Sequence, residues 1–456
     1  MRWGMTALAA LATLSGAWAA EPDSADSAAR YAGYYVAAPS VIVRIEARGA
    51  SLVAHSEGQP DTAYAPEGGG KFYASANNTR VTFQTDSDGV VTGALVAQGS
   101  GPGIPARRIT EAEGNRLAHP PVDQTLAPYA SMKDSARLPD GRVIHMVCMG
   151  RGSPVVVLTA GAGGWGIVWN KVQPAVAEKT RVCAWDRAGF GLSELSPKPQ
   201  TIDNTTSDLE AALKAGAIAG PYVVVGHSLG GLESLLLKDR QPRNVVGMVL
   251  VDPSFPDQAE RFKRAAPVLN AANAQENPAV TLFHKCAAGL RAGTVRAGAD
   301  PDGCLRGQSF PLDYPPELRA ALEKHPADLP PETVASAMDF LAASASPQWI
   351  DADMKIAINP QRNYGSTPLV VLTAGEAPAP PGASDVIKSQ IGLQQAEWRR
   401  AHDELAALST RGVNRIVEGS PHTIQQVKPQ VVIDSIDEVV DQARADMAKS
   451  GKTPGR

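Results

Sequence analysis

The spacing of apolar residues divides the chain into two regions. Between residues 29 and 112, short runs rich in apolar and β-branched residues, such as 41–45 and 80–83, are separated by polar, Gly- and Asn-rich turns. Short runs bounded by turn residues are typical of strands, and no helical period is present. We therefore predict a small all-β domain over residues 21–115.

A different pattern follows a Pro-rich linker, which we place at residues 116–128. Uninterrupted apolar runs alternate there with segments of helical spacing, as in parallel sheets that are covered by helices on both faces. The sequence predicts an α/β domain over residues 129–450, with a last helix that begins at Pro429, and a disordered tail over residues 451–456. The apolar runs that predict the strands lie at 155–158, 182–185, 222–225, 245–251, 369–372 and 413–417.

The alternation breaks between two of the predicted strands, at about residues 255–365. Helical segments and a Gly-rich stretch occupy this interval. A long insertion between core strands is where an enzyme carries a lid or a cap that selects the substrate. We therefore predict a helical cap insertion, with a purely structural excursion as the alternative.

The first 20 residues have the features of a secretory signal peptide. Arg2 gives a short positive region, residues 5–14 are apolar, and Ala17-Trp18-Ala19 has the small-x-small pattern of a cleavage site. The apolar stretch is shorter than the ~20 residues that span a bilayer, and no later stretch qualifies, so we expect no integral membrane span. The mature protein is predicted to be periplasmic or secreted.

An oxidising compartment allows disulfides, which gives the four cysteines a structural meaning. Cys286 and Cys304 share one Gly-rich stretch of the predicted insertion, and we expect a bridge between them. Cys148 and Cys183 each lie in an apolar, strand-like run. They pair if those strands are neighbours, and otherwise they are two buried free thiols.

The charge balance argues against one class of partner. The chain has 43 Lys and Arg residues against 47 Asp and Glu residues, so it lacks the basic excess that binds phosphate backbones, and we expect no nucleic-acid partner. The sequence contains no H-E-x-x-H, no C-x-x-C pair and no phosphate loop that ends in Lys-Ser/Thr. We therefore expect neither a metal nor a cofactor.

The sharpest chemical signal is the motif Gly226-His227-Ser228-Leu229-Gly230, which joins a predicted strand to a helical segment. In such a turn the glycines avoid side-chain clashes, and the serine hydroxyl is pushed into the open at the helix N-terminus. Ser228 is the predicted nucleophile. The alternative is an incidental serine in a Gly-rich turn.

On this motif and its setting, the chain from about residue 130 to residue 450 resembles the α/β-hydrolase superfamily, and within it the capped branch of esterases and iminopeptidases. The resemblance implies an oxyanion loop over residues 159–164, whose sequence is TAGAGG. The backbone N–H groups of Ala162 and Leu229 would then be the two oxyanion donors.

The resemblance also covers two further motifs. In the turn over residues 186–191, DRAGFG, it implies structural roles for Asp186 and Arg187. In the loop over residues 419–424, GSPHTI, it implies the catalytic histidine, which is His422. An imidazole can accept the proton of a serine hydroxyl near neutral pH, and a serine has little nucleophilicity without such a base.

The carboxylate of the triad is ambiguous. Most members of the family carry it after the strand that corresponds to residues 369–372, but the loop that follows here has no Asp, and the nearest carboxylates are Glu376 and Asp385. The other known position follows the preceding strand, where Asp252 preserves the order Ser, Asp, His. We favour Asp252 and keep Glu376 and Asp385 as alternatives.

The predicted β-domain resembles the small lipocalin-like domain appended to some serine-β-lactamase-like hydrolases. The features that carry this resemblance include YAGYY over residues 31–35, Phe72 and the VTF run over residues 81–83. Nothing in it is typical of a catalytic site. We expect a folding or docking module whose partner is unknown.

Together these features predict a serine hydrolase that cleaves a small-molecule carboxylic ester through an acyl-enzyme. A peptidase of the iminopeptidase type on the same triad is one alternative. A catalytically inactive hydrolase fold that serves as a binding module is another, and it is favoured by the missing Asp after residues 369–372.

Overall fold

The chain divides into two compact units: the first consists of the residues up to Pro120 together with residues 301–303, and the second of the remaining residues. The predicted signal peptide over residues 1–20 and the predicted tail over residues 451–456 lie outside the described residues. The computed structural model describes residues 25–38, 41–56, 61–76, 78–98, 103–118, 120–273, 278–296, 298–300, 302–305, 313–322, 330–345, 347–379 and 383–449.

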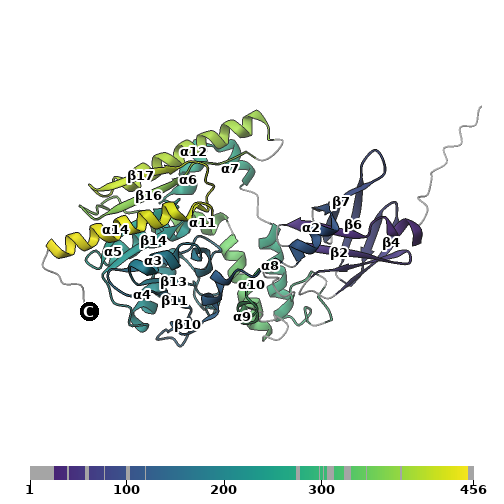
Figure 1. Ribbon diagram of the computed structural model, residues 1–456, viewed down its shortest axis with the longest axis horizontal. Helices are drawn as coiled ribbons and strands as arrows, with labels where there is room; N and C mark the ends of the chain where they lie inside the picture. Colours follow the sequence, from purple (N-terminus) through teal and green to yellow (C-terminus); the bar gives the residue numbers. More distant parts are fainter. Residues whose placement is uncertain are drawn as a thin grey trace, which may run out of the picture. The chain divides into compact units, whose positions relative to one another are not determined.

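The first unit is a closed antiparallel barrel in which each strand pairs with the next and β8 pairs with β1. Its core is aromatic: the rings of Tyr31 and Phe83 stack with centroids 4.4 Å apart, and Phe72 packs edge-on against both. The all-β prediction is therefore confirmed. The barrel consists of β1 (Gly33–Ala38), β2 (Val41–Arg48), β3 (Ser51–His55), β4 (Thr62–Gly68), β5 (Lys71–Ala74), β6 (Thr79–Thr85), β7 (Val91–Gln98) and β8 (Ile104–Ile109), flanked by helices α1 (Ala25–Ala29) and α2 (Glu111–Ala118) (Figure 1).

The second unit is built on a seven-stranded sheet with the order β11-β13-β12-β14-β15-β16-β17. β11 is antiparallel to its neighbour, and the other strands are parallel. The strands are β11 (Met146–Met149), β12 (Val155–Thr159), β13 (Val182–Trp185), β14 (Tyr222–His227), β15 (Val245–Val251), β16 (Leu369–Ala374) and β17 (Gly412–Val417), and a small hairpin of β9 (Ala136–Arg137) and β10 (Val143–Ile144) lies outside the sheet.

Helices cover both faces of this sheet, as the apolar runs predict. Along β12 and β14, alternate valines enter two different cores. One core includes α4 (Ile202–Ala215), α5 (Leu229–Arg240) and α12 (Asp385–Ala406). The other includes α3 (Gln173–Lys179), α13 (Ile424–Val427), α14 (Pro429–Lys449) and the short turns η1 (Gln124–Ala130) and η2 (Gly166–Trp169).

The predicted insertion is helical and fills the crossover between the adjacent strands β15 and β16. α8 and α10 are joined by the ion pair of Arg291 and Glu332, and a small core that contains Cys286 and Cys304 lies between them. Its helices are α6 (Gln258–Ala265), α7 (Pro267–Asn273), α8 (Pro278–Arg291), α9 (Pro316–Leu322), α10 (Pro331–Ala345) and α11 (Pro347–Ile356).

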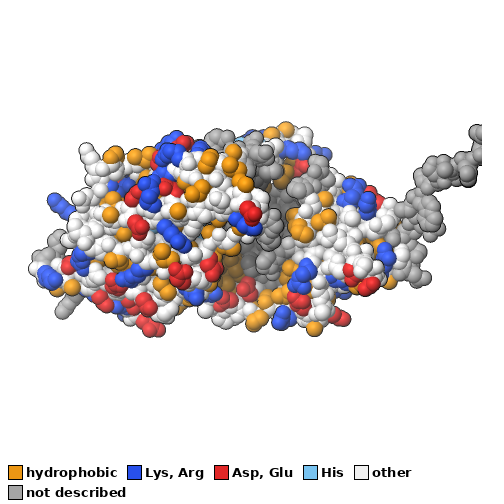
Figure 2. Space-filling model, turned by 90° about the horizontal axis from the view of Figure 1, so that it is seen from above, with side chains coloured by type: hydrophobic (Ala, Val, Ile, Leu, Met, Phe, Trp, Pro, Cys, Tyr) orange, Lys and Arg blue, Asp and Glu red, His pale blue; other side chains and the backbone are white. Residues whose placement is uncertain are grey.

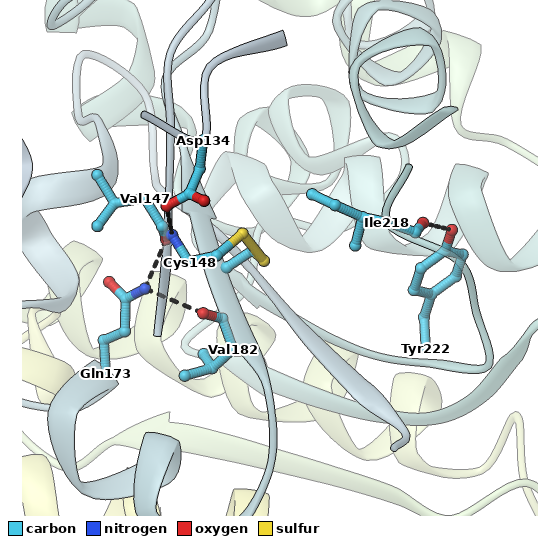
Figure 3. The surroundings of a disulfide bond; sticks show 8 residues. Asp134, Val147, Cys148, Gln173, Val182, Ile218 and Tyr222 are labelled. Carbon is cyan, nitrogen blue, oxygen red and sulfur yellow. Dashed lines mark hydrogen bonds between the residues drawn. A yellow bond between two sulfur atoms is a disulfide. The ribbon is translucent and has the colours of Figure 1, made fainter. Parts of the chain in front are cut away.

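Both cysteine pairs form disulfides. Cys286 is bonded to Cys304, and Cys148 in β11 is bonded to Cys183, its direct partner across β13 (Figure 3). The same strand pair is held by Gln173, whose side-chain amide donates to the carbonyls of both strands. The alternative of two free thiols is therefore wrong.

On the face of the second unit that Figure 2 shows, Lys and Arg side chains are interspersed with Asp and Glu side chains. Among the helices that are described, none is long and apolar enough to cross a membrane.

Candidate active site

Ser228 occupies a strained turn between β14, which ends at His227, and α5, which begins at Leu229. Its φ of 52° and ψ of −121° place an L-residue in a region that it rarely adopts. The flanking glycines are required by space. A Cβ on Gly226 would lie 2.2 Å from the carbonyl oxygen of Gly230, and a Cβ on Gly230 would lie 2.6 Å from that of Ala160.

The backbone of Ser228 is held from several directions. Its N–H donates to the carbonyl of Val251 at the end of β15, and its carbonyl accepts from the N–H groups of Gly231 and Ser254 at 2.8 Å each. These bonds fix the turn, while the serine residue itself is only partly buried. Such a turn presents the hydroxyl at the first, unpaired N–H groups of α5.

Of the three candidate carboxylates, Asp252 is the one that contacts His422. Its Oδ2 accepts from Nδ1 of His422 at 2.6 Å. Asp252 directly follows β15, has a φ of 41° and is 3% exposed, whereas the His422 side chain is 46% exposed. Buried carboxylate and accessible imidazole are arranged as in a catalytic pair.

The other oxygen of Asp252 is fully engaged. Oδ1 accepts from the backbone N–H of Ala374 and from the indole N–H of Trp398, both at 2.8 Å. Burial acts to raise the pKa of Asp252, but the hydrogen bond with His422, the Ala374 N–H and the nearby His402 lower that pKa below its usual range. The carboxylate is therefore ionised at neutral pH.

Glu376 and Asp385 do not take this position. The side chain of Asp385 is fully exposed and forms an ion pair with Lys388 at 3.1 Å. Glu376 is exposed in the loop after β16, where its backbone N–H donates to Ser420. Neither carboxylate makes a hydrogen bond with His422 in the described part of the chain.

Two further histidines support the pair. His227 donates from Nε2 to the carbonyl of His422 at 3.0 Å, and the two rings lie 4.6 Å apart. Burial lowers the pKa of His227 to about 4, so its ring is neutral. His402 donates from Nε2 to the carbonyl of Pro253, and burial lowers its pKa as well.

Sequence reasoning missed Trp398 and His402 of α12. Trp398 donates a hydrogen bond to Asp252 itself, and His402 donates one to the carbonyl of the next residue, Pro253. One signal could have found them. Their spacing of i and i+4 places an indole and an imidazole on the same face of one helix, and two polar aromatic groups on a buried face need partners.

The predicted oxyanion loop follows β12 and passes directly against the nucleophile. A Cβ on Gly161 would lie 2.8 Å from Nδ1 of His227 and 3.0 Å from Cβ of Ser228. Ala162, which supplies one predicted donor, is exposed, and Leu229, which supplies the other, is the first residue of α5. Their roles as donors remain predictions.

The turn after β13 has extensive structural contacts. Asp186 is completely buried, and it accepts from Nδ1 of His145 at 2.7 Å and from the backbone N–H groups of Gly166 and Leu192. His145, which has no motif context in the sequence, is therefore the partner of Asp186. No cluster of three or more metal-ligating side chains is found in the described ranges.

Comparison with known proteins places this fold in a family. Residues 156–435 match the alpha/beta hydrolase family. Lipase LipV of Mycobacterium tuberculosis is 31% identical over 188 residues, which are 41% of this chain and 63% of that protein. The uncharacterized protein YqjL of Bacillus subtilis is 32% identical over 110 residues, which are 24% of this chain and 44% of that protein.

A solved structure, a thermophilic esterase from Thermogutta terrifontis, is 19% identical with a TM-score of 0.40, and the match covers 68% of this chain and 98% of that chain. The chain spans less than two thirds of the length of the two relatives above. The family match, in contrast, covers well over half of the 456 residues, and the chain therefore belongs to the alpha/beta hydrolase family.

Proposed function

We propose that this protein is a serine hydrolase that cleaves a carboxylic ester through Ser228, His422 and Asp252. The observation that carries the proposal is the 2.6 Å contact between His422 Nδ1 and the buried Asp252 carboxylate. A contact of this kind commits Nδ1 to donating, which leaves Nε2 as the ring atom that accepts a proton.

The chemistry follows from these positions. Ser228 Oγ attacks the substrate carbonyl carbon while His422 Nε2 takes the hydroxyl proton, and the tetrahedral oxyanion accepts hydrogen bonds from the N–H groups of Ala162 and Leu229. His422 then gives the proton to the departing alkoxide, which leaves as the alcohol. Water, deprotonated by His422, attacks the acyl-enzyme and releases the carboxylic acid and Ser228.

Asp252 serves this cycle in two ways. It keeps the imidazole in the tautomer whose Nε2 is free, and its negative charge stabilises the imidazolium that forms in each half-reaction. Its contact with His422 argues against an inactive hydrolase fold, the alternative that the missing Asp after residues 369–372 favours. The name of the relative Lipase LipV supports an ester substrate.

We also propose that the mature protein acts in the periplasm or outside the cell. The support is the leader pattern over residues 1–20 together with the two disulfides, which persist in oxidising compartments. We assign the barrel a folding or docking role.

The test combines covalent labelling with turnover. Wild-type mature protein and its Ser228→Ala variant are treated with a fluorophosphonate probe and assayed on p-nitrophenyl esters of increasing acyl length. A Ser207→Ala variant is the matched control, because Ser207 is an exposed helical serine that donates to the carbonyl of Asp203.

We expect stoichiometric labelling and ester turnover in the wild type and in the Ser207→Ala variant, and neither in the Ser228→Ala variant. Folded wild-type protein that is not labelled would overturn the proposal and favour the inactive alternative. Labelling with cleavage of aminoacyl amides but not of esters would instead establish the peptidase.

A further inference from the structure

We infer that Arg187, held by Glu233, is a positioning residue that fixes the direction of the Ala162 N–H group in the proposed oxyanion hole. The inference rests on the proposed function, and it assigns a role in catalysis to a buried ion pair that is not part of the triad. Arg187 lies in the turn after β13, and its side chain is 4% exposed.

The guanidinium group of Arg187 links two elements of the site. On one side it donates to the carbonyls of the oxyanion loop, from Nη1 to Gly161 at 2.9 Å and from Nη2 to Ala160 at 2.6 Å. On the other side, Nε and Nη2 donate to the two carboxylate oxygens of Glu233. Glu233 is completely buried in α5, the helix that follows Ser228.

The bond to Gly161 decides where the next N–H group points. In a trans peptide the carbonyl and the N–H group point in opposite directions, so a carbonyl of Gly161 that is anchored on Arg187 directs the N–H of Ala162 away from Arg187. A flip of this peptide would break the bond to Arg187. It would also exchange a hydrogen-bond donor for an acceptor at the position where negative charge develops.

The loop needs such a restraint because of its own sequence. Residue 161 must be glycine, since a Cβ there would lie 3.0 Å or less from Ser228 and His227. Glycine, however, adopts many backbone conformations, and Gly163 has a positive φ of 70° in the same loop. The loop has one internal hydrogen bond here, from the N–H of Gly164 to the carbonyl of Gly161 at 3.1 Å, and the contacts with Arg187 add the restraint from outside.

The ion pair also sets the spacing of the two proposed donors. Ala162 belongs to the loop that Arg187 binds, and Leu229 belongs to the helix that contains Glu233. A single buried pair therefore connects both halves of the hole. The positive guanidinium group polarises the peptides whose carbonyls it binds, which strengthens their N–H groups as donors.

The first test is kinetic and uses Arg187→Lys and Glu233→Gln. A lysine ammonium lacks the planar fork that reaches two carbonyls and a carboxylate together. For Arg187→Lys we expect kcat for p-nitrophenyl butyrate to fall about 100-fold with KM changed less than threefold, because an oxyanion donor acts mainly in the transition state. For Glu233→Gln we expect a smaller fall, about 10-fold.

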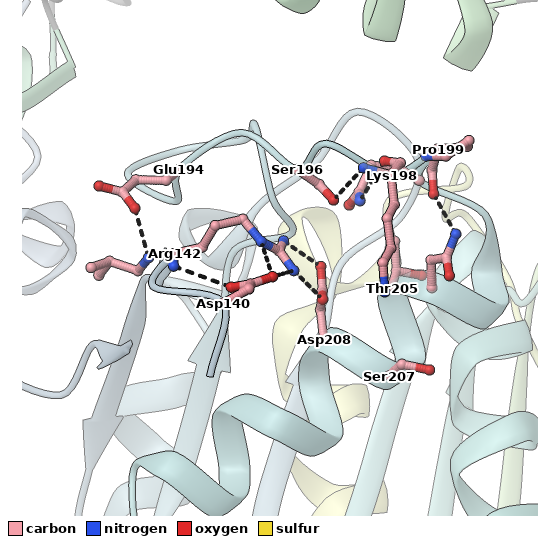
Figure 4. Close-up of polar contacts among 12 residues, drawn as sticks. Asp140, Arg142, Glu194, Ser196, Lys198, Pro199, Thr205, Ser207 and Asp208 are labelled. Atoms are coloured by element: carbon pink, nitrogen blue, oxygen red, sulfur yellow. Dashed lines mark hydrogen bonds and ion pairs between the residues drawn. The ribbon is translucent and has the colours of Figure 1, made fainter. Parts of the chain in front are cut away.

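A readout specific to positioning is the affinity for a trifluoromethyl ketone, which forms an oxyanion with the serine. Its Ki should rise across the variants in proportion to the loss of kcat/KM. The matched control is Arg142→Lys, because Arg142 also forms a bidentate ion pair, with Asp208 of α4 at 2.7 and 2.8 Å (Figure 4). Among the described residues, its hydrogen-bond partners Asp140 and Asp208 lie outside the oxyanion loop. This control should keep its kcat and its Ki.

The second test does not depend on activity. Crystal structures of the wild type and of Arg187→Lys, or of Glu233→Gln if the lysine variant does not fold, should differ in the orientation or order of the Gly161–Ala162 peptide. An unchanged peptide overturns the inference even if the wild type hydrolyses no ester, in which case the proposed function fails separately. Wild-type ester turnover with unchanged kcat and Ki in both variants also overturns it, and leaves the proposed function standing.

Discussion

The replacement Asp252→Asn tests which carboxylate serves His422. In the native site Oδ1 accepts from two donors, the N–H groups of Ala374 and Trp398. The amide oxygen of asparagine keeps that position, because an NH₂ group there would face two other donors. The NH₂ group is then directed at Nδ1 of His422, which lies 2.6 Å from the native Oδ2.

That geometry determines the size of the effect. A ring nitrogen facing an NH₂ group must accept, so the imidazole proton moves to Nε2, and the ring can no longer take the proton of Ser228. Tautomer reversal of this kind costs about 10⁴ in kcat. At about 1.4 kcal/mol for each tenfold change, the barrier rises by about 5 kcal/mol. We expect KM to change little, because the substrate does not contact Asp252 in the proposed cycle.

The assay compares kcat and KM for p-nitrophenyl butyrate in four proteins: the wild type, Asp252→Asn, Glu376→Gln and Asp385→Asn. Thermal unfolding of each variant establishes that it is folded at the assay temperature. Glu376→Gln and Asp385→Asn should stay within twofold of the wild type. The reasoning is refuted if Asp252→Asn keeps more than a tenth of the activity while Glu376→Gln loses it.

Three further predictions concern the turn, the pH dependence and the disulfides. In Gly226→Ala, the new Cβ would lie 2.2 Å from the carbonyl oxygen of Gly230, so we expect the unfolding free energy in urea to fall by about 1–3 kcal/mol and kcat to fall as well. An unchanged urea midpoint would contradict this contact. Burial raises the pKa of Asp353 to about 7, against about 3.9 in an unfolded chain, so its contribution to stability is present below about pH 4 and is lost as the pH rises through 7. The Tm of Asp353→Asn relative to the wild type should therefore rise from pH 5 to pH 8, and a Tm difference that stays constant over this range would argue against the shift. Replacing Cys148 and Cys183 by alanine opens a loop with a sequence separation of 35 and should lower the unfolding free energy by about 4 kcal/mol in guanidinium chloride, whereas a loss below 1 kcal/mol would count against the chain-entropy reasoning.

Much of the fold could be predicted because its determinants are local. The apolar run at 155–158 becomes β12, and Pro429 begins the last helix because proline fits the first turn. The turn at Ser228 is local in part: Gly226 is required by the carbonyl of Gly230, four residues away, whereas Gly230 is required by the carbonyls of the loop after β12.

The acid could not be chosen from the sequence for the opposite reason. Asp252 and His422 are separated by 170 residues, and their contact depends on how the loops after β15 and β17 meet. Trp398 was missed because an indole on a helix is more often packing than a hydrogen-bond donor to a carboxylate. The hydrogen bonds from Arg187 to the oxyanion loop could not be predicted either. The sequence of the turn after β13 does not indicate that Arg187 pairs with Glu233 in α5.

The closed ring of the first unit has a consequence for how such a chain can change over evolutionary time. Because β1 pairs with both β2 and β8, no strand of the ring presents an open edge that a neighbour must complete. Its aromatic core is likewise built from its own residues. A gene segment that encodes such a ring can be fused to, or lost from, an enzyme gene without leaving either product with an unfinished sheet.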